Sequence, residues 1–195
     1  MQASSARLEE PHIAPLTEFV KRIRLETDAK VPWFDPADAG VEARALFLFQ
    51  DPGRSGAAVS GYVSVDNDDP SARAITQLRA SAGLRRGEVV HWNAIPWELD
   101  RDPKVSDIVD AQPYTDELID LLPCLQVVVA FGRWAQQAWI GRRYGGRFDI
   151  VGFGCPHTSQ RALNQPGNRE RVAATLAETR RVLDHHGPRK SAATL

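Results

Sequence analysis

Ala45-Leu-Phe-Leu-Phe-Gln50 is the stretch that decides the fold, because it is a short run of apolar, β-forming residues that ends in a polar, glycine-rich loop. Three later segments, 88–95, 125–131 and 148–153, have the same character. Segments with apolar residues at helical spacing separate the four runs. This alternation predicts an α/β fold, in the form of a three-layer α/β/α sandwich with a central four-stranded parallel β-sheet.

The segments around these strands predict the helices. Apolar spacing, capping residues and helix breakers place them at 15–27, 71–84, 115–122, 133–143 and 168–186. Thr115 is the expected N-cap of the third helix, since the preceding segment 96–113 is rich in Pro and Asp and is expected to be a loop. We expect a single domain over residues 1–195, with an N-terminal helix and cover segment at 1–44 and a flexible tail at 188–195.

The composition is that of an ordinary folded domain. Of the 195 residues, 43% are hydrophobic and 25% are charged, which excludes collagen-like, disordered and disulfide-stapled small proteins. No apolar run approaches the roughly 20 residues of a membrane span, and the N-terminal segment lacks the apolar core of a signal peptide. We therefore expect a cytoplasmic protein with no membrane partner.

Metal and redox sites are not expected. The two cysteines, Cys124 and Cys155, are too few for a four-thiolate zinc or iron–sulfur site, and we expect both to be unpaired packing residues. The acidic loop Asp66–Asp69 lacks the regular ligand spacing and the closing Glu of a calcium loop, and Asp near a helix start is explained by capping. We therefore expect neither a metal nor a cofactor.

Charge is unevenly distributed along the chain, although the net charge is only -1. Residues 1–124 hold 13 Lys and Arg against 21 Asp and Glu, whereas residues 125–195 hold 11 against 4. One interpretation is a polarised surface whose basic side meets a polyanion. The alternative is that the helices scatter these charges over all faces.

Polar side chains follow the strands at one edge of the predicted sheet. Asp51 comes directly after the first strand, Asn93 lies in the end of the second, and His157 comes after the fourth. Because ligands of parallel sheets bind at the carboxyl ends of the strands, we expect these three side chains to converge. His91 should share a strand face with Asn93, as a supporting residue or a packed one.

These three residues suit hydrolysis of an N-glycosidic bond. A carboxylate can orient water, an amide offers a donor and an acceptor to a base edge, and a neutral imidazole can donate to a developing oxyanion. Each also has a structural interpretation: Asp51 could cap a turn, Asn93 could bond loop backbone, and His157 could be a hydrogen-bonded, partly buried histidine. Their coincidence at three strand ends favours the catalytic interpretation.

Four motifs resemble those of the uracil-DNA glycosylase superfamily, in the same order and spacing over about residues 31–181. They are Gln50–Gly53, Trp92–Pro96, Val127–Gly132 and His157–Gln160. The family pattern at the last of these is usually His-Pro-Ser-Pro, and Thr158 and Gln160 replace its two prolines here. The iron–sulfur branches carry four cysteines, so the resemblance points to a branch without the cluster.

The resemblance implies roles for the residues at the strand ends. Asp51 would activate the attacking water, His157 would stabilise charge on O2 of the base, and Asn93 would read the pyrimidine edge. Gln50 would offer backbone contacts to the base. Extrusion of the base is implied as well, since the glycosidic carbon is inaccessible in a stacked duplex.

Two further positions of the implied base pocket differ from the best-known members. Gly53 replaces the Tyr that excludes thymine, as in branches of broader specificity. Tyr62 is the aromatic residue expected to stack on the base, with Trp92 and Trp97 as alternatives that could equally be packing residues.

The resemblance also assigns DNA contacts to the basic second part of the chain. Ser159 would contact a phosphate near the flipped nucleotide, and the segment from Arg161 to Arg169 would hold the strand. Arg161 occupies the position of the family's intercalating Leu, and Leu163 lies nearby.

The predicted function is therefore a metal-independent DNA glycosylase that removes uracil or a related deaminated base from DNA and acts as a monomer. One alternative is a non-catalytic nucleic-acid-binding module on the same fold. Another is a hydrolase of free nucleosides or nucleotides, whose activity would depend little on salt, whereas DNA binding weakens steeply with salt.

Overall fold

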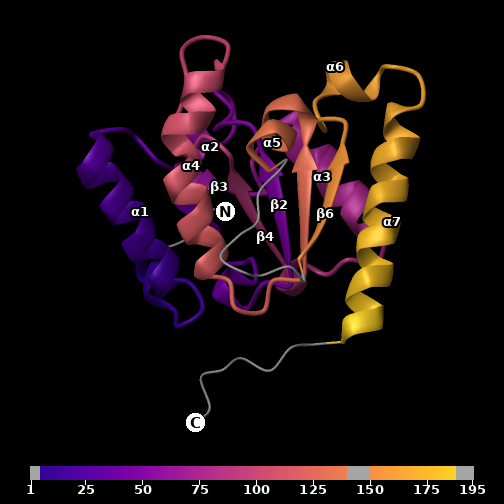
Figure 1. Cartoon of the computed structure of the whole chain (residues 1–195), viewed down its shortest axis with the longest axis horizontal. Helices are drawn as coiled ribbons and strands as arrows, with labels where there is room; N and C mark the ends of the chain where they lie inside the picture. The colour runs from indigo at the N-terminus through magenta and orange to yellow at the C-terminus, as the bar shows by residue number, and fades with distance from the viewer. Residues whose placement is uncertain (1–4, 140–149, 188–195) are drawn as a thin grey trace.

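The central sheet has four parallel strands. A computed structural model describes residues 5–139 and 150–187. Strands β2 (Ala45–Phe49), β4 (Val89–Asn93), β5 (Val127–Phe131) and β6 (Val151–Cys155) lie in the order β4-β2-β5-β6, as Figure 1 shows. The predicted four-stranded parallel sheet is confirmed. Residues 148 and 149, where the fourth strand was expected to begin, lie outside the described residues.

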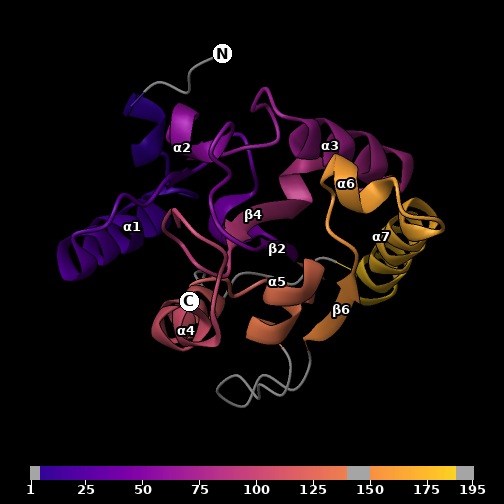
Figure 2. The same ribbon diagram turned by 90° about the horizontal axis from the view of Figure 1, so that it is seen from above.

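Helices cover both faces of the sheet, so the predicted three-layer sandwich is confirmed. One face packs against α1 (Ala14–Thr27), α4 (Val105–Asp120) and α5 (Gly132–Trp139), and the other against α3 (Pro70–Ser81) and α7 (Asn168–His186), as Figure 2 shows. Alternate residues of β2 face opposite layers, with Leu46 and Leu48 in one core and Phe47 in the other. The odd-numbered residues of β2 and β4 therefore lie on the α3 and α7 side.

Helix α4 differs from its prediction. It begins at Val105, and Thr115, the expected N-cap, is a buried residue in its interior. Asp107 fixes the true start, because its carboxylate accepts the Lys104 amide at 2.7 Å and pairs with Arg101. The hydrogen bond from Arg101 lowers the pKa of Asp107 to about 2, although burial opposes the shift.

Pro113 explains why the prediction for α4 was wrong. Proline signals a loop in a sequence, because it cannot donate a backbone hydrogen bond and disfavours the helical interior. Here Pro113 lies on the exposed side of the helix. The buried face, which includes Ile108, Ala111 and Leu118, continues through the proline position and outweighs the missing hydrogen bond.

Short elements that the sequence did not predict hold the N-terminal cover segment in place. Strand β1 (Trp33–Phe34) pairs in parallel with β3 (Tyr62–Val63), and Phe34 stacks on Trp92 of β4 with ring centroids 3.8 Å apart. The other short elements are helices α2 (Ala57–Ser60) and α6 (Gln160–Leu163) and the 3-10 turns η1 (Ser5–Glu9), η2 (Gly40–Glu42) and η3 (Arg86–Glu88). Helix α6 lies beyond the carboxyl end of β6, at the top of Figure 1.

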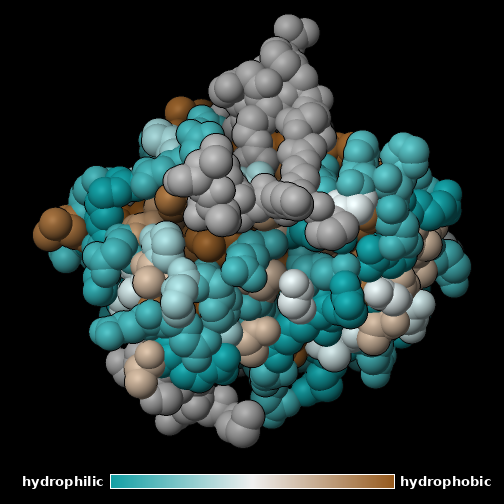
Figure 3. All heavy atoms as spheres, turned by 90° about the horizontal axis from the view of Figure 1, so that it is seen from below, coloured by the Kyte–Doolittle hydropathy of each residue, from teal (hydrophilic) through white to brown (hydrophobic). Residues whose placement is uncertain are grey.

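A network of ion pairs closes the amino end of the sheet. Glu88 accepts hydrogen bonds from Arg85 and Arg180 and pairs with Arg44. Burial would raise the pKa of Glu88, but the hydrogen bonds from Arg85 and Arg180 lower it to about 2. Arg44 and Gln126 also donate to the carbonyl of Gly187, which fastens the end of α7 to the sheet. The surface on this side is largely hydrophilic with scattered apolar residues (Figure 3).

Three further predictions concern the ends of elements and the domain organisation. The tail at 188–195 and the expected helix end at 140–143 lie outside the described residues. The single-domain interpretation of residues 1–195 stays a prediction. None of the described helices combines the length and the apolar character that a membrane span requires.

Candidate active site

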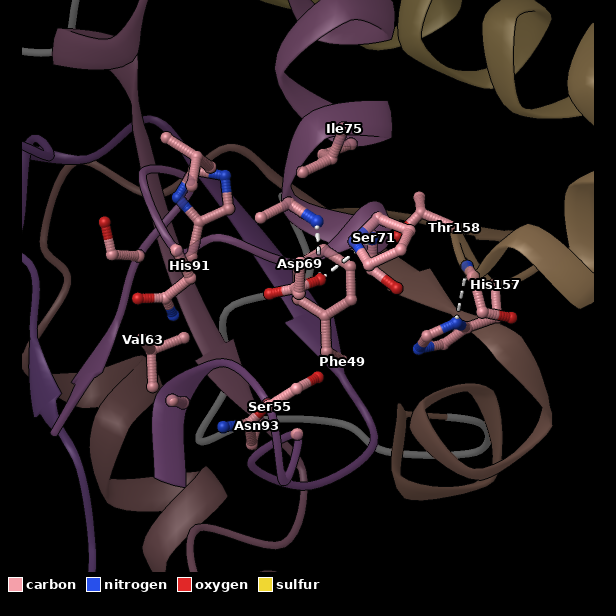
Figure 4. Close-up of a pocket in the computed structure, with 18 of the residues that line it drawn as sticks. Phe49, Ser55, Val63, Asp69, Ser71, Ile75, His91, Asn93, His157 and Thr158 are labelled. Atoms are coloured by element: carbon pink, nitrogen blue, oxygen red, sulfur yellow. Dashed lines mark hydrogen bonds between the residues drawn. The ribbon is translucent and has the colours of Figure 1, made fainter. Parts of the chain in front are cut away.

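A cavity of about 330 Å³ opens at the carboxyl ends of β2 and β4, beneath the first turn of α3. Figure 4 shows side chains from β2, β4, α3 and the segment after β6 around it. Its apolar wall includes Phe49, Val63, Val65, Ala72 and Ile75, and its polar groups include Asp51, Asp69, His91, Asn93, His157, Thr158 and Ser159. A mostly apolar pocket with a few convergent polar groups is typical of a small-ligand site.

Asp51 lines the cavity, two residues beyond the end of β2. The Gln50 side-chain amide donates to its Oδ1 at 2.7 Å. Burial raises the pKa of Asp51 above its usual range, and the hydrogen bonds from Gln50 and from the Leu99 backbone oppose that shift. Such a partly desolvated carboxylate is a stronger base than an exposed one and is suited to accept a proton from water.

Asn93 and His91 face the cavity from β4. The two residues are one pleat apart, so their side chains point to the same side of the strand. Asn93 is 4% exposed and His91 is 2% exposed. Within the part of the chain that the structure describes, Asn93 Nδ2 and His91 Nε2 have no hydrogen-bond partner. Buried polar atoms without partners are costly, and a ligand that pairs with them recovers that free energy.

His157 is held on the other side of the site, two residues after β6. The Ser159 backbone amide donates to its Nδ1 at 2.9 Å, so the neutral ring carries its proton on Nε2. Burial lowers the pKa of His157, against an opposing effect of the Asp69 carboxylate, and the ring is therefore neutral at pH 7. Nε2–H is a donor that suits a carbonyl or a developing oxyanion.

Gly132 makes room for His157. It lies at the start of α5 with φ +82°, and a Cβ placed there would lie 3.1 Å from the Cβ of His157. A side chain at this position would adopt an unfavourable backbone conformation and would also press on the imidazole. Gly132, the glycine predicted to follow the third strand, therefore leaves the space in which the His157 side chain lies.

The structure brings most of the predicted site residues together, but not all of them. Asp51, Gly53, Asn93, His157 and Ser159 all line the cavity. Gln50 contributes its hydrogen bond to Asp51, and its side chain does not line the cavity.

Tyr62 does not take the position expected of a base-stacking aromatic residue. Its neighbour Val63 lines the cavity, and adjacent residues of a strand point to opposite faces, so Tyr62 faces the α1 side. The aromatic ring that lines the cavity belongs to Phe49. Its ring centroid lies 6.1 Å from that of His157 and 6.3 Å from that of His91. Sequence reasoning missed Phe49, because an apolar residue in a buried strand is indistinguishable from a core residue.

The predicted DNA-contacting residues lie beside the cavity. Leu163 and Arg169 line a neighbouring hollow together with Arg73, and Arg169 is exposed. Leu163 is half-buried and packs against the core next to α7. Arg161 is exposed on α6 and lines neither hollow. Ser159 caps α6, with Oγ accepting the Ala162 amide at 3.4 Å.

Asp69 and Thr158 also line the cavity, although neither was predicted as a site residue. Asp69 Oδ1 accepts the backbone amides of Ser71 and Ala72 at 2.8 and 2.9 Å, which makes it the N-cap of α3. Thr158 is fully buried, and its hydroxyl has no partner among the described residues. Asp69 followed by Pro70 is a recognisable helix N-cap pattern in the sequence. Thr158 had been noted only because it replaces a proline of the family pattern.

Cys155 lies two residues before His157 but is not suited to nucleophilic chemistry. It is 2% exposed, and burial raises the pKa of its thiol to about 12. The thiolate, which is the reactive form, is therefore scarce at neutral pH.

Comparisons with known proteins match most of the chain to one family. A model of the uracil DNA glycosylase superfamily matches residues 36–180, well over half of the chain. The curated proteins include no match to it. Among solved structures, a mimivirus UNG variant crystallised in complex with UGI is similar, with 16% sequence identity, coverage of 82% of this chain and 69% of that chain, and a TM-score of 0.44.

Proposed function

Because the chain belongs to the uracil DNA glycosylase superfamily, we propose that it hydrolyses the N-glycosidic bond of uracil, or of a related deaminated base, in DNA. The observation that carries the proposal is the convergence of Asp51, Asn93 and His157 on one cavity. Members of this superfamily are hydrolytic enzymes. Asp51 offers a general base, Asn93 can hydrogen-bond the edge of the nucleobase, and His157 offers a hydrogen-bond donor to a developing oxyanion.

In the proposed reaction the target nucleotide is flipped out of the DNA and its base enters the cavity. The bond between the sugar C1′ and the base nitrogen breaks, and its electron pair moves into the base. His157 Nε2–H donates to the carbonyl oxygen on which negative charge develops, which stabilises the leaving group without transfer of a full proton.

Asp51 would act on the other reactant. Its carboxylate orients a water molecule toward C1′ and accepts a proton as the water oxygen bonds to that carbon. Gln50, through the 2.7 Å hydrogen bond to Oδ1, and the Leu99 backbone both donate to the carboxylate and hold it in position. The apolar wall formed by Phe49, Val63 and Ile75 excludes bulk water from the base.

Exposed arginines beside the cavity support DNA as the substrate. Arg73 and Arg169 line the hollow next to the cavity, and Arg161 is exposed on α6 close by. Arginines of this kind bind phosphates, so DNA affinity should fall as salt rises, because counterions are released on binding.

The deciding experiment is an excision assay. The protein is incubated with single- and double-stranded oligonucleotides that contain uracil, hypoxanthine or xanthine, and alkali then cleaves any abasic site. We expect strand scission with at least one of these bases. Scission with none of them, while the oligonucleotides still bind, would refute the enzymatic proposal and favour a binding module.

Two variants make the assay specific. Asp51→Asn keeps the hydrogen bond from Gln50 but removes the carboxylate that acts as general base. Excision should therefore fall at least about 10²–10⁴-fold while DNA affinity is retained. Asp110→Asn is the matched control, since Asp110 is exposed on α4 and does not line the cavity. Activity on free deoxyuridine with little dependence on salt would instead indicate a nucleoside hydrolase.

A further inference from the structure

The cavity extends well below the edge of the sheet at which Asn93 lies. Asn93 is the last residue of β4, and His91 lines the same cavity two residues earlier, about 7 Å further from the carboxyl end of the strand. On α3, Ser71 and Ile75 both line the cavity and are separated by about 6 Å along the helix axis. Figure 4 shows Ile75 and His91 on the side of the cavity away from Asn93. Two walls from different elements therefore give the cavity a similar depth.

The deep end of the cavity is enclosed and mostly apolar. Val65, Ile75 and His91 line it and are 7%, 2% and 2% exposed. The Val65 carbonyl accepts the hydroxyl of Thr76 at 3.4 Å, which places Val65 beside the second turn of α3. Nδ1 of His91 lies 2.6 Å from Asp38, and its Nε2 has no hydrogen-bond partner among the described residues. The deep end thus offers apolar contacts and one unpartnered polar atom.

Small residues line the cavity on the side of the loop that follows β2. They are Gly53, Ser55 and Ala57. A Cβ added at Gly53 would meet no described atom within 4 Å apart from those of its chain neighbours. This loop therefore places no bulky side chain in the path of a wide, flat base that enters the cavity.

A one-ring base would leave the deep end empty. When a pyrimidine is held with its polar edge at Asn93, the space beside Ile75 and His91 stays unfilled, and the lining of that space loses its dispersion contacts. A purine has a second ring between the sugar and the six-membered ring, so the polar edge of its six-membered ring lies one ring further from the sugar. A bicyclic base therefore fills the part of the cavity that uracil does not reach.

We propose that this cavity takes a deaminated purine, hypoxanthine or xanthine, in preference to uracil. The proposal rests on the proposed function, which supplies the restriction to deaminated bases, and it narrows the substrate class by size. The bond between N9 and C1′ breaks and its electron pair moves into the purine, while the water oxygen bonds to C1′ and Asp51 accepts the water proton. Purine N3 is bonded to the carbon next to the glycosidic nitrogen, as O2 is in uracil, so Nε2–H of His157 donates to N3.

The first test compares the bases in one sequence context. Oligonucleotides that differ only in carrying hypoxanthine, xanthine or uracil at one position are incubated with the protein, and alkali then cleaves the abasic sites. The kcat/KM for at least one deaminated purine should exceed that for uracil at least about tenfold, since even one buried methylene group contributes about 10–200-fold to discrimination. A kcat/KM for uracil equal to or above those of both purines would overturn the inference.

Variants that fill the deep end test its role directly. Ile75→Phe should lower excision of the purine relative to uracil at least about tenfold, and Val65→Leu, which adds less volume, should change the ratio in the same direction. Both rates are measured on one protein, so partial unfolding lowers them together and leaves their ratio unchanged. Leu78→Phe is the matched control, because Leu78 is buried on α3 but does not line the cavity, and its ratio should stay within about twofold of the parent protein. An unchanged ratio in both Ile75→Phe and Val65→Leu would refute the inference.

Calorimetric titration with free hypoxanthine and free uracil gives a readout that does not require catalysis and separates this inference from the proposed function. Hypoxanthine should bind at least about tenfold more tightly than uracil, and Ile75→Phe should remove that preference. Preferential binding of hypoxanthine by a protein that excises none of the three bases would refute the glycosylase and retain the assignment of the cavity. Excision of uracil alone would retain the glycosylase and show that the inference is wrong.

Discussion

Both ends of the β-sheet hold buried polar groups, but those at the amino end are paired, whereas several at the carboxyl end lack partners or are desolvated. At the amino end, Glu88 lies among Arg44, Arg85 and Arg180, and although burial opposes the shift, the hydrogen bonds from Arg85 and Arg180 lower its pKa to about 2. At the carboxyl end, burial raises the pKa of Asp51. Asn93 Nδ2 there has no partner in the described part of the chain.

The difference separates what stabilises the fold from what is available to a ligand. The lowered pKa of Glu88 means that its ionised form favours the folded state, and removing one of its partners would leave buried charge uncompensated. A desolvated carboxylate and unpartnered amide cost free energy, which is recovered only when a ligand binds. The four predictions that follow test this contrast, from the largest expected effect to the smallest.

Glu88→Gln should weaken the fold strongly. It leaves Arg44 and Arg180 without their shared carboxylate, which should cost about 3 kcal/mol and lower the Tm by roughly 6–12 °C. Thermal unfolding measures the change. Glu178→Gln is the matched control, an exposed i,i+3 partner of Arg181, and should shift the Tm by less than about 3 °C. Equal shifts in the two variants would contradict the distinction between the two ends.

Stability should depend on pH through Glu88. Its pKa is lower in the folded state than in the unfolded state, so its contribution is present above the ordinary glutamate pKa of 4.5 and is lost as the pH falls toward about 2. Denaturant unfolding at a series of pH values should therefore show stability falling over this window. In Glu88→Gln the fall should be shallower. An unchanged slope would show that other carboxyl groups carry the acid sensitivity.

Gly132→Ala should both destabilise the fold and lower excision. With φ +82° the substitution should cost about 1–2 kcal/mol, and the added Cβ should also displace His157 and lower excision. Gly83→Ala is the matched control, since Gly83 has φ +70° and an added Cβ there would make only an ordinary contact, 3.9 Å from Cδ of Arg180. We expect similar losses of Tm in both variants and a loss of excision in Gly132→Ala alone. Equal excision rates would mean that this glycine does not position His157.

Asp51→Asn should slightly stabilise the protein while it abolishes excision. The folded-state pKa of Asp51 is raised, so the charged form is less favourable in the folded chain, and stability is lost as the pH rises through that pKa. An uncharged amide avoids this loss, and the Tm at pH 7 should rise by about 1–3 °C. At pH 4 the gap between the variant and the parent protein should narrow. A Tm of the variant below that of the parent protein at pH 7 would show that the Asp51 carboxylate stabilises the fold, as that of Glu88 does, and would contradict the contrast between the two ends.

The sheet and the position of the site could be predicted from the sequence, because both follow from local pattern. Runs of apolar residues identified all four strands, and the polar residues at the ends of β2, β4 and β6 lie at the edge where parallel sheets bind ligands. Asp51, Asn93 and His157 were therefore found without any knowledge of their contacts.

What could not be predicted depends on long-range contacts or on the direction of a single side chain. Tyr62 faces away from the cavity because β3 pairs with β1, a two-residue pairing too short to leave a pattern. The start of α4 was missed because the buried face that overrides Pro113 is defined by its packing against the sheet and α1. Asp38 contacts His91 from 53 residues away, and no spacing rule connects them.

The central strand β2 has a consequence for biosynthesis. It is the first strand of the sheet to be made, and its partners β4 and β5 follow about 40 and about 80 residues later, which at 5–20 residues per second is a delay of roughly 2–16 s. During that time five consecutive apolar residues, Ala45–Phe49, wait without a partner strand and could pair with another nascent chain. Arg44 and Asp51 flank this run, so the ion-pair network and the candidate site each also supply a charged gatekeeper against aggregation.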